Sequence, residues 1–426
     1  MPIRLPLLAA GLLFASTAFA EDWPAFRGPN RDGISKETGL LKTWSKDGPP
    51  IAWTAKNLGL GYGTPTIAKG MIFGMGTRGG KDGIWALKET DGSELWFTPF
   101  DDPRKTNQNN GPSASPTFDD GKVFAVSSNG KLVALDSADG KLIWQRDYLA
   151  DFGGKVPSWG FTDSALIDGD KLICVPGGPK AAIVALNKKT GKDIWKSEIN
   201  GGGSGGGGYC SPEKVKLAGK EMYVVLMGAS AGVVGVSPDT GKLLWDYKGK
   251  AAGGGVAQIP IPIVAGDNVW VSCAYSGGSA LLKIEADGSD KFKATEIKAY
   301  KKPDLNNHHG GMVQVGDYAY FGHDQSNGKP VCVDLKDGEI KWGPVAIPNG
   351  GGGSAAVLSA DGLLYFRYTN GVVVLIEPSP EKLKVVASFK EADRSGKESW
   401  AHPVIVGKKL YLRDQEKLVC YDVKAK

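Results

Sequence analysis

One pattern recurs along this chain at an almost constant interval: a small or apolar residue is followed by glycine six positions on and by an aromatic residue ten positions on. Six copies are present: Ala86/Gly92/Trp96, Ala134/Gly140/Trp144, Ala185/Gly191/Trp195, Gly235/Gly241/Trp245, Leu282/Gly288/Phe292 and Cys332/Gly338/Trp342. The aromatic members recur every 47 to 51 residues. A repeat of this length indicates a propeller, a solenoid or another array of similar units.

Each copy lies in a unit with the pattern of four short strands, which we name A to D in chain order. In the second unit, residues 115–145, runs of β-branched and aromatic residues are separated by Asp-Gly and Asn-Gly pairs, which favour tight hairpin turns. Gly140 falls in the C–D turn, where glycine adopts a positive φ without strain. Trp144 falls on strand D, and we expect such rings to pack against the neighbouring unit. The corresponding residues form the predicted blade seams: Trp53, Trp96, Trp144, Trp195, Trp245, Phe292 and Trp342.

The repeat predicts eight units. The last unit, residues 402–423, has only three strands, and residues 51–54, with Trp53, supply the missing strand D from the start of the repeat region. The 376 residues after Pro50 divide into eight units of 47. We therefore expect an all-β, eight-bladed β-propeller of four-stranded blades, closed by an N-terminal strand that completes the last blade. An open solenoid is the alternative, but it does not need a strand displaced to the start.

The first 50 residues lie outside this repeat. Arg4, the apolar run at 5–15 and the ending Ala18-Phe19-Ala20 are typical of a signal peptide cleaved after Ala20. We expect a periplasmic or secreted protein with no membrane anchor, because no later apolar run could span a membrane. Residues 21–50 form an N-terminal extension, expected along the outside of the ring, with a role in covering a site as the alternative. Residues 51–426 form the propeller domain.

Charge limits the kinds of partner that we expect, and cysteine content limits the expected disulfides and metal sites. The formal net charge is +5, and the lysines are scattered rather than interleaved with aromatic residues in a stripe, so we expect no nucleic acid. An envelope protein or a small ligand is the expected partner. The five cysteines are an odd number, and no two are adjacent. We expect small buried thiols rather than disulfides or a metal site, with Cys210, beside a glycine run, as the most exposed thiol.

The pattern of a small residue, glycine and tryptophan on strands C and D resembles the propeller repeats of the pyrroloquinoline quinone (PQQ) family. That superfamily includes quinoprotein alcohol dehydrogenases and a non-catalytic lipoprotein of the outer-membrane barrel-assembly machinery. The segments at 23–33, 307–311 and 410–415 resemble a third group, exported PQQ-like proteins of largely unassigned function. The resemblance implies a fold more than a reaction.

Catalytic quinone chemistry is disfavoured by the loops. The dehydrogenases to which the resemblance points hold calcium and quinone over the channel with carboxylates and, typically, a disulfide between adjacent cysteines. Here the corresponding loops are rich in glycine, at 201–208, 253–255 and 350–353, whereas calcium prefers six to eight oxygen ligands. We therefore expect a non-catalytic binding or scaffold module without a cofactor. The alternative is a PQQ-dependent alcohol or sugar dehydrogenase that uses PQQ with calcium.

Blade geometry predicts one binding face. The D–A and B–C loops of four-stranded blades lie on the same face, and all four histidines fall on these loops or at strand ends beside them. Polar and aromatic residues that converge on a concave mouth are candidates for ligand binding. The candidates are His308, His309, His323, Asp324, Trp400, His402, Trp159, Tyr209, Gln258 and Asn110. The alternative is that these side chains only cap neighbouring strands. Neither the histidine spacing nor any serine context predicts a metal site or a catalytic residue.

Overall fold

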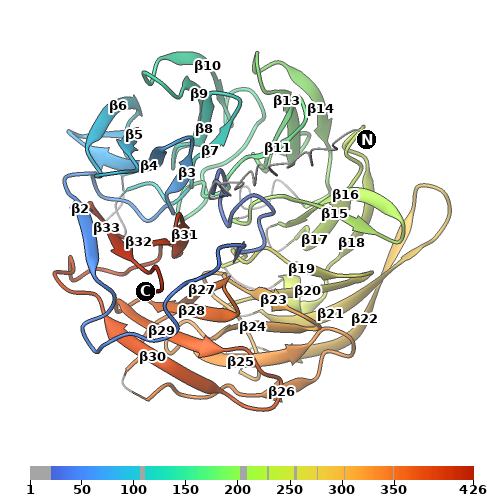
Figure 1. Cartoon of the computed structure of the whole chain (residues 1–426). Helices are drawn as coiled ribbons and strands as arrows, with labels where there is room; N and C mark the ends of the chain where they lie inside the picture. Colours follow the sequence, from blue (N-terminus) through green and yellow to red (C-terminus); the bar gives the residue numbers. More distant parts are fainter. Residues whose placement is uncertain are drawn as a thin grey trace, which may run out of the picture.

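The chain is a ring of β-sheets. The computed structural model describes residues 21–105, 111–201, 209–227, 230–253, 257–275, 277–301, 303–348 and 350–426. These described residues form eight sheets around a central channel (Figure 1). Strands A to D of each blade run from the channel outward and pair as successive antiparallel hairpins. The predicted all-β, eight-bladed propeller is confirmed.

The first four blades follow the repeat in chain order. Blade 1 contains β3 (Thr66–Ala68), β4 (Met71–Arg78), β5 (Lys81–Lys88) and β6 (Glu94–Asp101). Blade 2 contains β7 (Thr117–Asp119), β8 (Lys122–Val126), β9 (Lys131–Asp136) and β10 (Leu142–Asp147). Blade 3 contains β11 (Leu166–Asp168), β12 (Lys171–Cys174), β13 (Ile183–Asn187) and β14 (Asp193–Ser197). Blade 4 contains β15 (Glu213–Leu217), β16 (Lys220–Leu226), β17 (Val233–Val236) and β18 (Leu243–Tyr247).

The other four blades complete the ring. Blade 5 contains β19 (Ile263–Ala265), β20 (Asn268–Cys273), β21 (Gly278–Ala286) and β22 (Phe292–Lys301). Blade 6 contains β23 (Val313–Val315), β24 (Tyr318–His323), β25 (Lys329–Asp334) and β26 (Ile340–Trp342). Blade 7 contains β27 (Ala355–Ala360), β28 (Leu363–Tyr368), β29 (Val372–Glu377) and β30 (Lys384–Lys390), with β1 (Ile34–Ser35) added in parallel to β27. Blade 8 contains β31 (Val404–Val406), β32 (Lys409–Asp414), β33 (Lys417–Asp422) and β2 (Ile51–Ala55).

Blade 8 closes the ring. β2 pairs antiparallel with β33, and Trp53 lies opposite Cys420 in this pairing. Trp53 also contacts blade 1, because a Cβ placed on Gly92 would lie 2.6 Å from its ring. The two ends of the repeat region are therefore joined by hydrogen bonds within blade 8 and by packing between blades 8 and 1, as the sequence predicts.

The repeated tryptophans connect neighbouring blades. In four cases the indole Nε1 donates, over 2.7 to 3.0 Å, to a carbonyl oxygen of the next blade's C–D turn: Trp96 to Ser137, Trp144 to Lys188, Trp195 to Pro238 and Trp342 to Ser379. The ring of Trp96 also fills the space beside Gly140, and that of Trp144 the space beside Gly191. The glycine of the repeat therefore serves the preceding blade's tryptophan as well as its own turn.

Blades 4 and 5 depart from this arrangement. The Nε1 of Trp245 lies 2.9 Å from the sulfur of Met222 in its own blade. Phe292 lies opposite Ala286, whereas Leu282 pairs with Glu296. The β21–β22 hairpin is longer than the C–D hairpins of the other blades, and Phe292 is the first residue of β22, next to the hairpin turn.

Residues 22–36, which we call the strap, enter the central channel. They bond to the innermost strands, or to residues just before these strands, in six blades: Trp23 to Ile67, Pro24 to Phe118, Arg31 to Ala165, Arg27 to Met312, β1 to β27 and Ser35 to Ile405. The expectation that the extension lies along the outside of the ring is wrong for these residues. These bonds go to six different sheets around the channel. The sequence of the strap therefore lacks the alternating pattern of a strand that pairs within one sheet.

The strap reaches the channel from the face opposite the D–A loops. Both ends lie at A–B turns: Asp22 accepts the N–H of Lys69 over 3.3 Å, and Glu37, which directly follows the strap, accepts the N–H of Gly407 over 2.8 Å. Between these ends, the side chains of Trp23, Arg27 and Arg31 are only 3 to 4% exposed. The middle of the strap therefore closes the channel on the face opposite the D–A loops.

Two further features bear on the sequence analysis. The described residues contain one helix, α1 (Lys250–Gly253), and no described helix has the length and hydropathy needed to cross a membrane. All five cysteines are buried, without disulfide partners. The expectation for Cys210 is wrong: the loop entering blade 5 covers this thiol, which lies 3.4 Å from the carbonyl oxygen of Pro260. The expected signal peptide, residues 1–20, lies outside the described residues.

Candidate functional site

A pocket of about 250 Å³ opens at the channel mouth, on the face of the D–A and B–C loops. Aromatic and small hydroxylated side chains make up most of its lining: Phe26, Tyr62, Thr64, Ser113, Ser115, Trp159, Thr162, Ser164, Tyr209, Ser211, Ala257, Ile259, Tyr275, His308, His309, Trp400 and His402. Among these described lining residues none carries a carboxylate, an ammonium or a guanidinium group. The pocket is therefore apolar and uncharged, with hydroxyl groups on its surface.

The structure brings six of the ten candidate residues into this lining: Trp159, Tyr209, His308, His309, Trp400 and His402. The lining does not include His323, Asp324 or Gln258. The Nδ1 of His323 accepts the N–H of Asn306, in the loop entering blade 6, over 3.1 Å. Asp324 accepts the N–H of Ser326, two residues on. Gln258 is buried next to the lining residue Ala257. Asn110 lies outside the described residues.

Several lining residues escaped the sequence analysis. Phe26 reaches the pocket from the strap, and its ring lies 5.0 Å from that of His402. Thr64, Ser115, Ser164 and Ser211 each stand two residues before strand A of blades 1 to 4. Their recurrence with the period of the repeat is a signal that could have identified them. Phe26 and Tyr275 carry no comparable signal.

The four hydroxylated residues that precede strand A in blades 1 to 4 form what we call the hydroxyl arc. Each hydroxyl oxygen accepts a backbone N–H from the blade before it: Thr64 from His402 over 2.8 Å, Ser115 from Thr64 over 3.0 Å, Ser164 from Ser115 over 3.0 Å and Ser211 from Ser164 over 2.9 Å. None of these hydroxyls donates its own hydrogen to another described residue. The arc therefore links five blades and offers hydroxyl hydrogens to the pocket.

Five rings form a continuous surface that we call the ring wall. Its members are Tyr275, His308, His309, Trp400 and Tyr62, and consecutive ring centroids lie 5.1, 3.9, 4.5 and 4.6 Å apart. The rings come from loops of blades 5, 6, 8 and 1. The three spacings that involve Trp400 or Tyr275 are those of favourable aromatic contacts.

Burial keeps the three imidazoles of the pocket neutral. It lowers the pKa of His308 to about 4 and, with Arg27 and Arg367 nearby, the pKa of His402 to about 3. Burial also lowers the pKa of His309 well below its usual value. His308 Nδ1 shares a hydrogen bond of 2.6 Å with the Ser354 hydroxyl. At neutral pH these rings therefore contribute apolar faces and uncharged hydrogen-bonding nitrogens.

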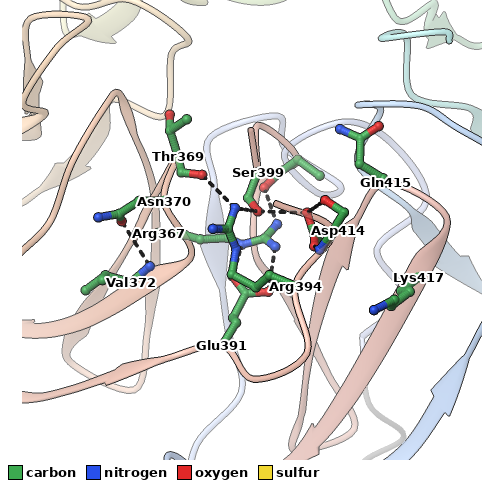
Figure 2. Close-up of polar contacts among 12 residues, drawn as sticks. Arg367, Thr369, Asn370, Val372, Glu391, Arg394, Ser399, Asp414, Gln415 and Lys417 are labelled. Carbon is green, nitrogen blue, oxygen red and sulfur yellow. Dashed lines mark hydrogen bonds and ion pairs between the residues drawn. The ribbon is translucent and has the colours of Figure 1, made fainter. Parts of the chain in front are cut away.

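A buried polar network holds the loop that carries Trp400 and His402 (Figure 2). Arg367, on β28, forms a two-pronged ion pair with Glu391, with both N–O distances 2.8 Å and both side chains at most 3% exposed. The same guanidinium donates to the carbonyl oxygen of Ala401 over 2.9 Å. The backbone between Trp400 and His402 is therefore fixed by a charged donor from blade 7.

A second part of the network fixes the preceding turn of this loop. Asp414, on β32, accepts hydrogen bonds from the hydroxyls of Ser395 and Ser399 over 2.9 and 3.1 Å (Figure 2). Arg394 donates to the carbonyl oxygen of Thr369 over 3.0 Å. The loop is therefore tied to blades 7 and 8 before it reaches the pocket.

Three more arginines lie behind the lining. Arg413 donates to the carbonyl oxygen of Gly63 over 2.9 Å, Arg31 to that of Ser164 over 2.7 Å, and Arg27 to that of Met312. Burial lowers the pKa of Arg413 to about 9 and that of Arg31 to about 10, the latter against the attraction of Glu213. Both groups remain charged at neutral pH, so positive charge lies close behind an uncharged surface.

The lining does not fit a calcium–quinone centre. Calcium prefers several carboxylate and carbonyl oxygens, and the described lining residues include no carboxylate. Within the described ranges no three His, Cys, Asp or Glu side chains are grouped so as to hold a metal ion. The undescribed segments after residue 20 contain no aspartate or glutamate in the sequence.

Comparisons with known proteins place these observations in context. A family model described as outer membrane protein assembly factor BamB matches residues 30–155 and 105–343. The chain is 26% identical to the quinoprotein ethanol dehydrogenase of Pseudomonas aeruginosa over 353 residues, which cover 76% of this chain and 52% of that protein. It is 27% identical to outer membrane protein assembly factor BamB of Burkholderia pseudomallei over 317 residues, which cover 70% of this chain and 74% of that protein.

A solved structure shows the same fold. A europium-containing methanol dehydrogenase matches 92% of this chain and 89% of its own, with a TM-score of 0.66 and 14% sequence identity. The chain spans about half the length of the ethanol dehydrogenase it matches. An outer membrane protein assembly factor and a quinoprotein dehydrogenase are thus similar to the chain at nearly equal, low identity.

Proposed function

The chain belongs to the PQQ-like β-propeller repeat family, and we propose that it is a non-catalytic binding module that holds a small molecule in the pocket at the channel mouth. One observation carries this proposal: nine aromatic rings, three of them imidazoles, converge with the hydroxyl arc on a concave site. Apolar pockets with a few well-placed polar groups are the usual form of small-molecule sites.

The absence of charge on the described lining supports a binding role. General acid–base catalysis works best with a group whose pKa lies near the working pH. The pKa values of His308 and His402, about 4 and about 3, lie well below neutrality. These rings are suited to contact a ligand rather than to exchange protons with it at neutral pH.

A PQQ-dependent alcohol or sugar dehydrogenase is the second candidate, because the chain is similar to a quinoprotein ethanol dehydrogenase. Purified protein incubated with PQQ and Ca²⁺ tests this candidate. A bound quinone spectrum, together with dye reduction by alcohols, would overturn the non-catalytic proposal. Unchanged spectra and no dye reduction would support it.

We also propose export to the periplasm or the medium, with cleavage after Ala20. N-terminal sequencing of protein purified from the envelope fraction of the native cells tests this cleavage directly. An envelope protein is the alternative partner, since one relative is named as an outer membrane assembly factor. Crosslinking followed by pull-down would reveal a stable complex of that kind.

Ligand binding itself is tested with a mixed panel of small molecules, including sugars, nucleosides, amino acids and aromatic acids, in thermal-shift assays. We expect at least one class to raise the Tm of the wild-type protein and to leave that of Trp400→Ala unchanged. Trp342→Phe is the matched control, because Trp342 lies in a seam outside the pocket, and it should respond like wild type. A panel without any hit, or hits that Trp400→Ala retains, would refute the proposed site.

A further inference from the structure

Two surfaces of different chemistry, the ring wall and the hydroxyl arc, make up much of the pocket lining. The ring wall, from Tyr275 through His309 to Tyr62, occupies loops of blades 5, 6, 8 and 1. The hydroxyl arc, from Thr64 to Ser211, stands before strand A of blades 1 to 4. Only Tyr62 and Thr64, two residues apart, bring both surfaces together in blade 1. A ligand that fills the space meets the flat faces of the ring wall and the hydroxyl groups of the arc, with the rings of Trp159 and Tyr209 beside the arc in the loops entering blades 3 and 4.

The arc is built to donate hydrogen bonds. Each of its four hydroxyl oxygens already accepts one backbone N–H, so its hydrogen and one lone pair are left for a ligand. Four such donors along one side match a ligand with several oxygen acceptors on one edge. The pocket also contains His309 Nδ1, which is buried and has no hydrogen-bond partner among the described residues.

Charge narrows the choice of ligand. Aromatic cages often bind quaternary ammonium groups, but here Arg413 lies behind Gly63, next to the lining residues Tyr62 and Thr64. No described lining residue carries a carboxylate that could pair with a cation, so a cation would leave water without a partner in the pocket. An anion would have to leave water for a lining on which no described residue carries a positive charge. A neutral ligand avoids both costs.

We infer that the pocket binds a single neutral carbohydrate ring, with its apolar C–H face against the ring wall and its hydroxyl oxygens toward the hydroxyl arc. This inference rests on the proposed binding function and specifies its ligand. A pyranose has the required two sides, an apolar face and an oxygen-rich edge. The volume of about 250 Å³ lies below the usual range for drug-sized ligands, about 300–1,000 Å³, and suits one ring rather than a chain of sugars.

Calorimetric titration with defined sugars tests the ligand class. The probes are D-glucose, D-galactose and D-mannose, with D-glucuronate and D-glucosamine as the anionic and cationic counterparts, and nicotinamide as a neutral planar compound. We expect at least one neutral sugar to bind at a single site, with each charged counterpart at least about tenfold weaker. Binding of nicotinamide without any neutral sugar would overturn the carbohydrate assignment.

Variants locate the two sides of the bound ring. Trp400→Ala removes part of the ring wall and should weaken sugar binding at least about tenfold. Ser164→Ala removes one donor of the arc and should weaken it similarly, whereas Ser164→Thr keeps the hydroxyl and should restore most of the affinity. Trp342→Phe, in a seam outside the pocket, is the control and should bind like wild type. Equal affinity in wild type and Ser164→Ala would overturn the role of the arc.

The outcomes separate this inference from the function on which it rests. If a non-sugar compound binds and Trp400→Ala abolishes its binding, the pocket is a binding site and only the carbohydrate assignment fails. If neither the sugars nor the mixed panel bind in the pocket, both fail. Sugar binding that is lost in Trp400→Ala and retained in Trp342→Phe supports both.

Discussion

The indole of Trp144 occupies the space that a side chain at Gly191 would need. A Cβ placed on Gly191 would lie 2.9 Å from the ring of Trp144, and the indole Nε1 donates to the carbonyl oxygen of Lys188, in the same turn, over 3.0 Å. The two residues belong to neighbouring blades. This pairing explains why the chain repeats glycine and tryptophan together: blades 1 to 4 each supply the glycine for the preceding blade's ring.

Replacement of Trp144 by alanine should destabilise the protein by about 3 kcal/mol, at the lower end of the range for large aromatic residues, because the ring is only partly buried. The variant loses both the contact with Gly191 and the hydrogen bond to Lys188. Urea unfolding measures the effect. Leu142→Ala is the control on the same strand: Leu142 is 53% exposed, so its change should stay within about 0.5 kcal/mol. Equal effects would contradict the seam.

Gly191→Ala should cost more than Gly169→Ala. Both glycines have positive φ, +69° and +58°, but only Gly191 has neighbouring atoms within 4 Å of the added Cβ. Backbone strain of about 1 kcal/mol applies to both, and overpacking against Trp144 adds about 1–3 kcal/mol at Gly191 alone. Thermal unfolding of the two variants measures the difference. Equal losses of stability in the two variants would show that backbone strain alone, without overpacking against Trp144, accounts for the cost at Gly191.

Replacement of Arg367 by methionine should destabilise the protein by about 3–5 kcal/mol, because it leaves the buried carboxylate of Glu391 without its partner. The double variant Arg367→Met/Glu391→Leu should be more stable than this single variant, because no unpaired charge remains. Chemical denaturation of the wild type, both single variants and the double variant gives the coupling free energy. Strictly additive losses would contradict the ion pair shown in Figure 2.

Acid should destabilise the protein partly through His402. Its pKa is about 3 in the folded protein and near 6.5 in an unfolded chain. Between these values the unfolded state binds more protons, so this contribution to stability is complete above about pH 6.5 and is lost as the pH falls. At pH 5 the loss amounts to about 2 kcal/mol. The Tm of His402→Gln should therefore fall less between pH 7 and pH 5 than that of wild type. Identical pH slopes in the two proteins would contradict the assignment.

Arg31→Leu should cost about 2–4 kcal/mol, because it removes two buried hydrogen bonds from a charged group of the strap to carbonyl oxygens of Ser164 and Ala165. Lys36→Leu is the matched control. Lys36 forms an exposed ion pair with Glu21, which contributes at most about 1 kcal/mol. Differential scanning calorimetry compares the two. A loss for Arg31→Leu no larger than that for Lys36→Leu would show that the strap does not need its anchor in blade 3.

The candidate site was only partly predictable from the sequence. Blade geometry placed His308, His309 and His402 on one face, because the positions of D–A loops follow from the repeat itself. It gave no means to separate these residues from His323, whose ring caps a neighbouring backbone N–H. It also left out Phe26, which reaches the pocket from a segment without any strand periodicity.

The sequence by itself determined the ring: the number of blades, their strands and the closing strand follow from local turns and a fixed period. Only the tertiary structure decided the path of the strap and the composition of the pocket. These depend on contacts such as Phe26 with His402, and Arg27 with Met312, between residues hundreds of positions apart. Contacts of that kind occur once and leave no period, so the repeat records the positions of the hydroxyl arc but not the side chains that the strap brings to the pocket.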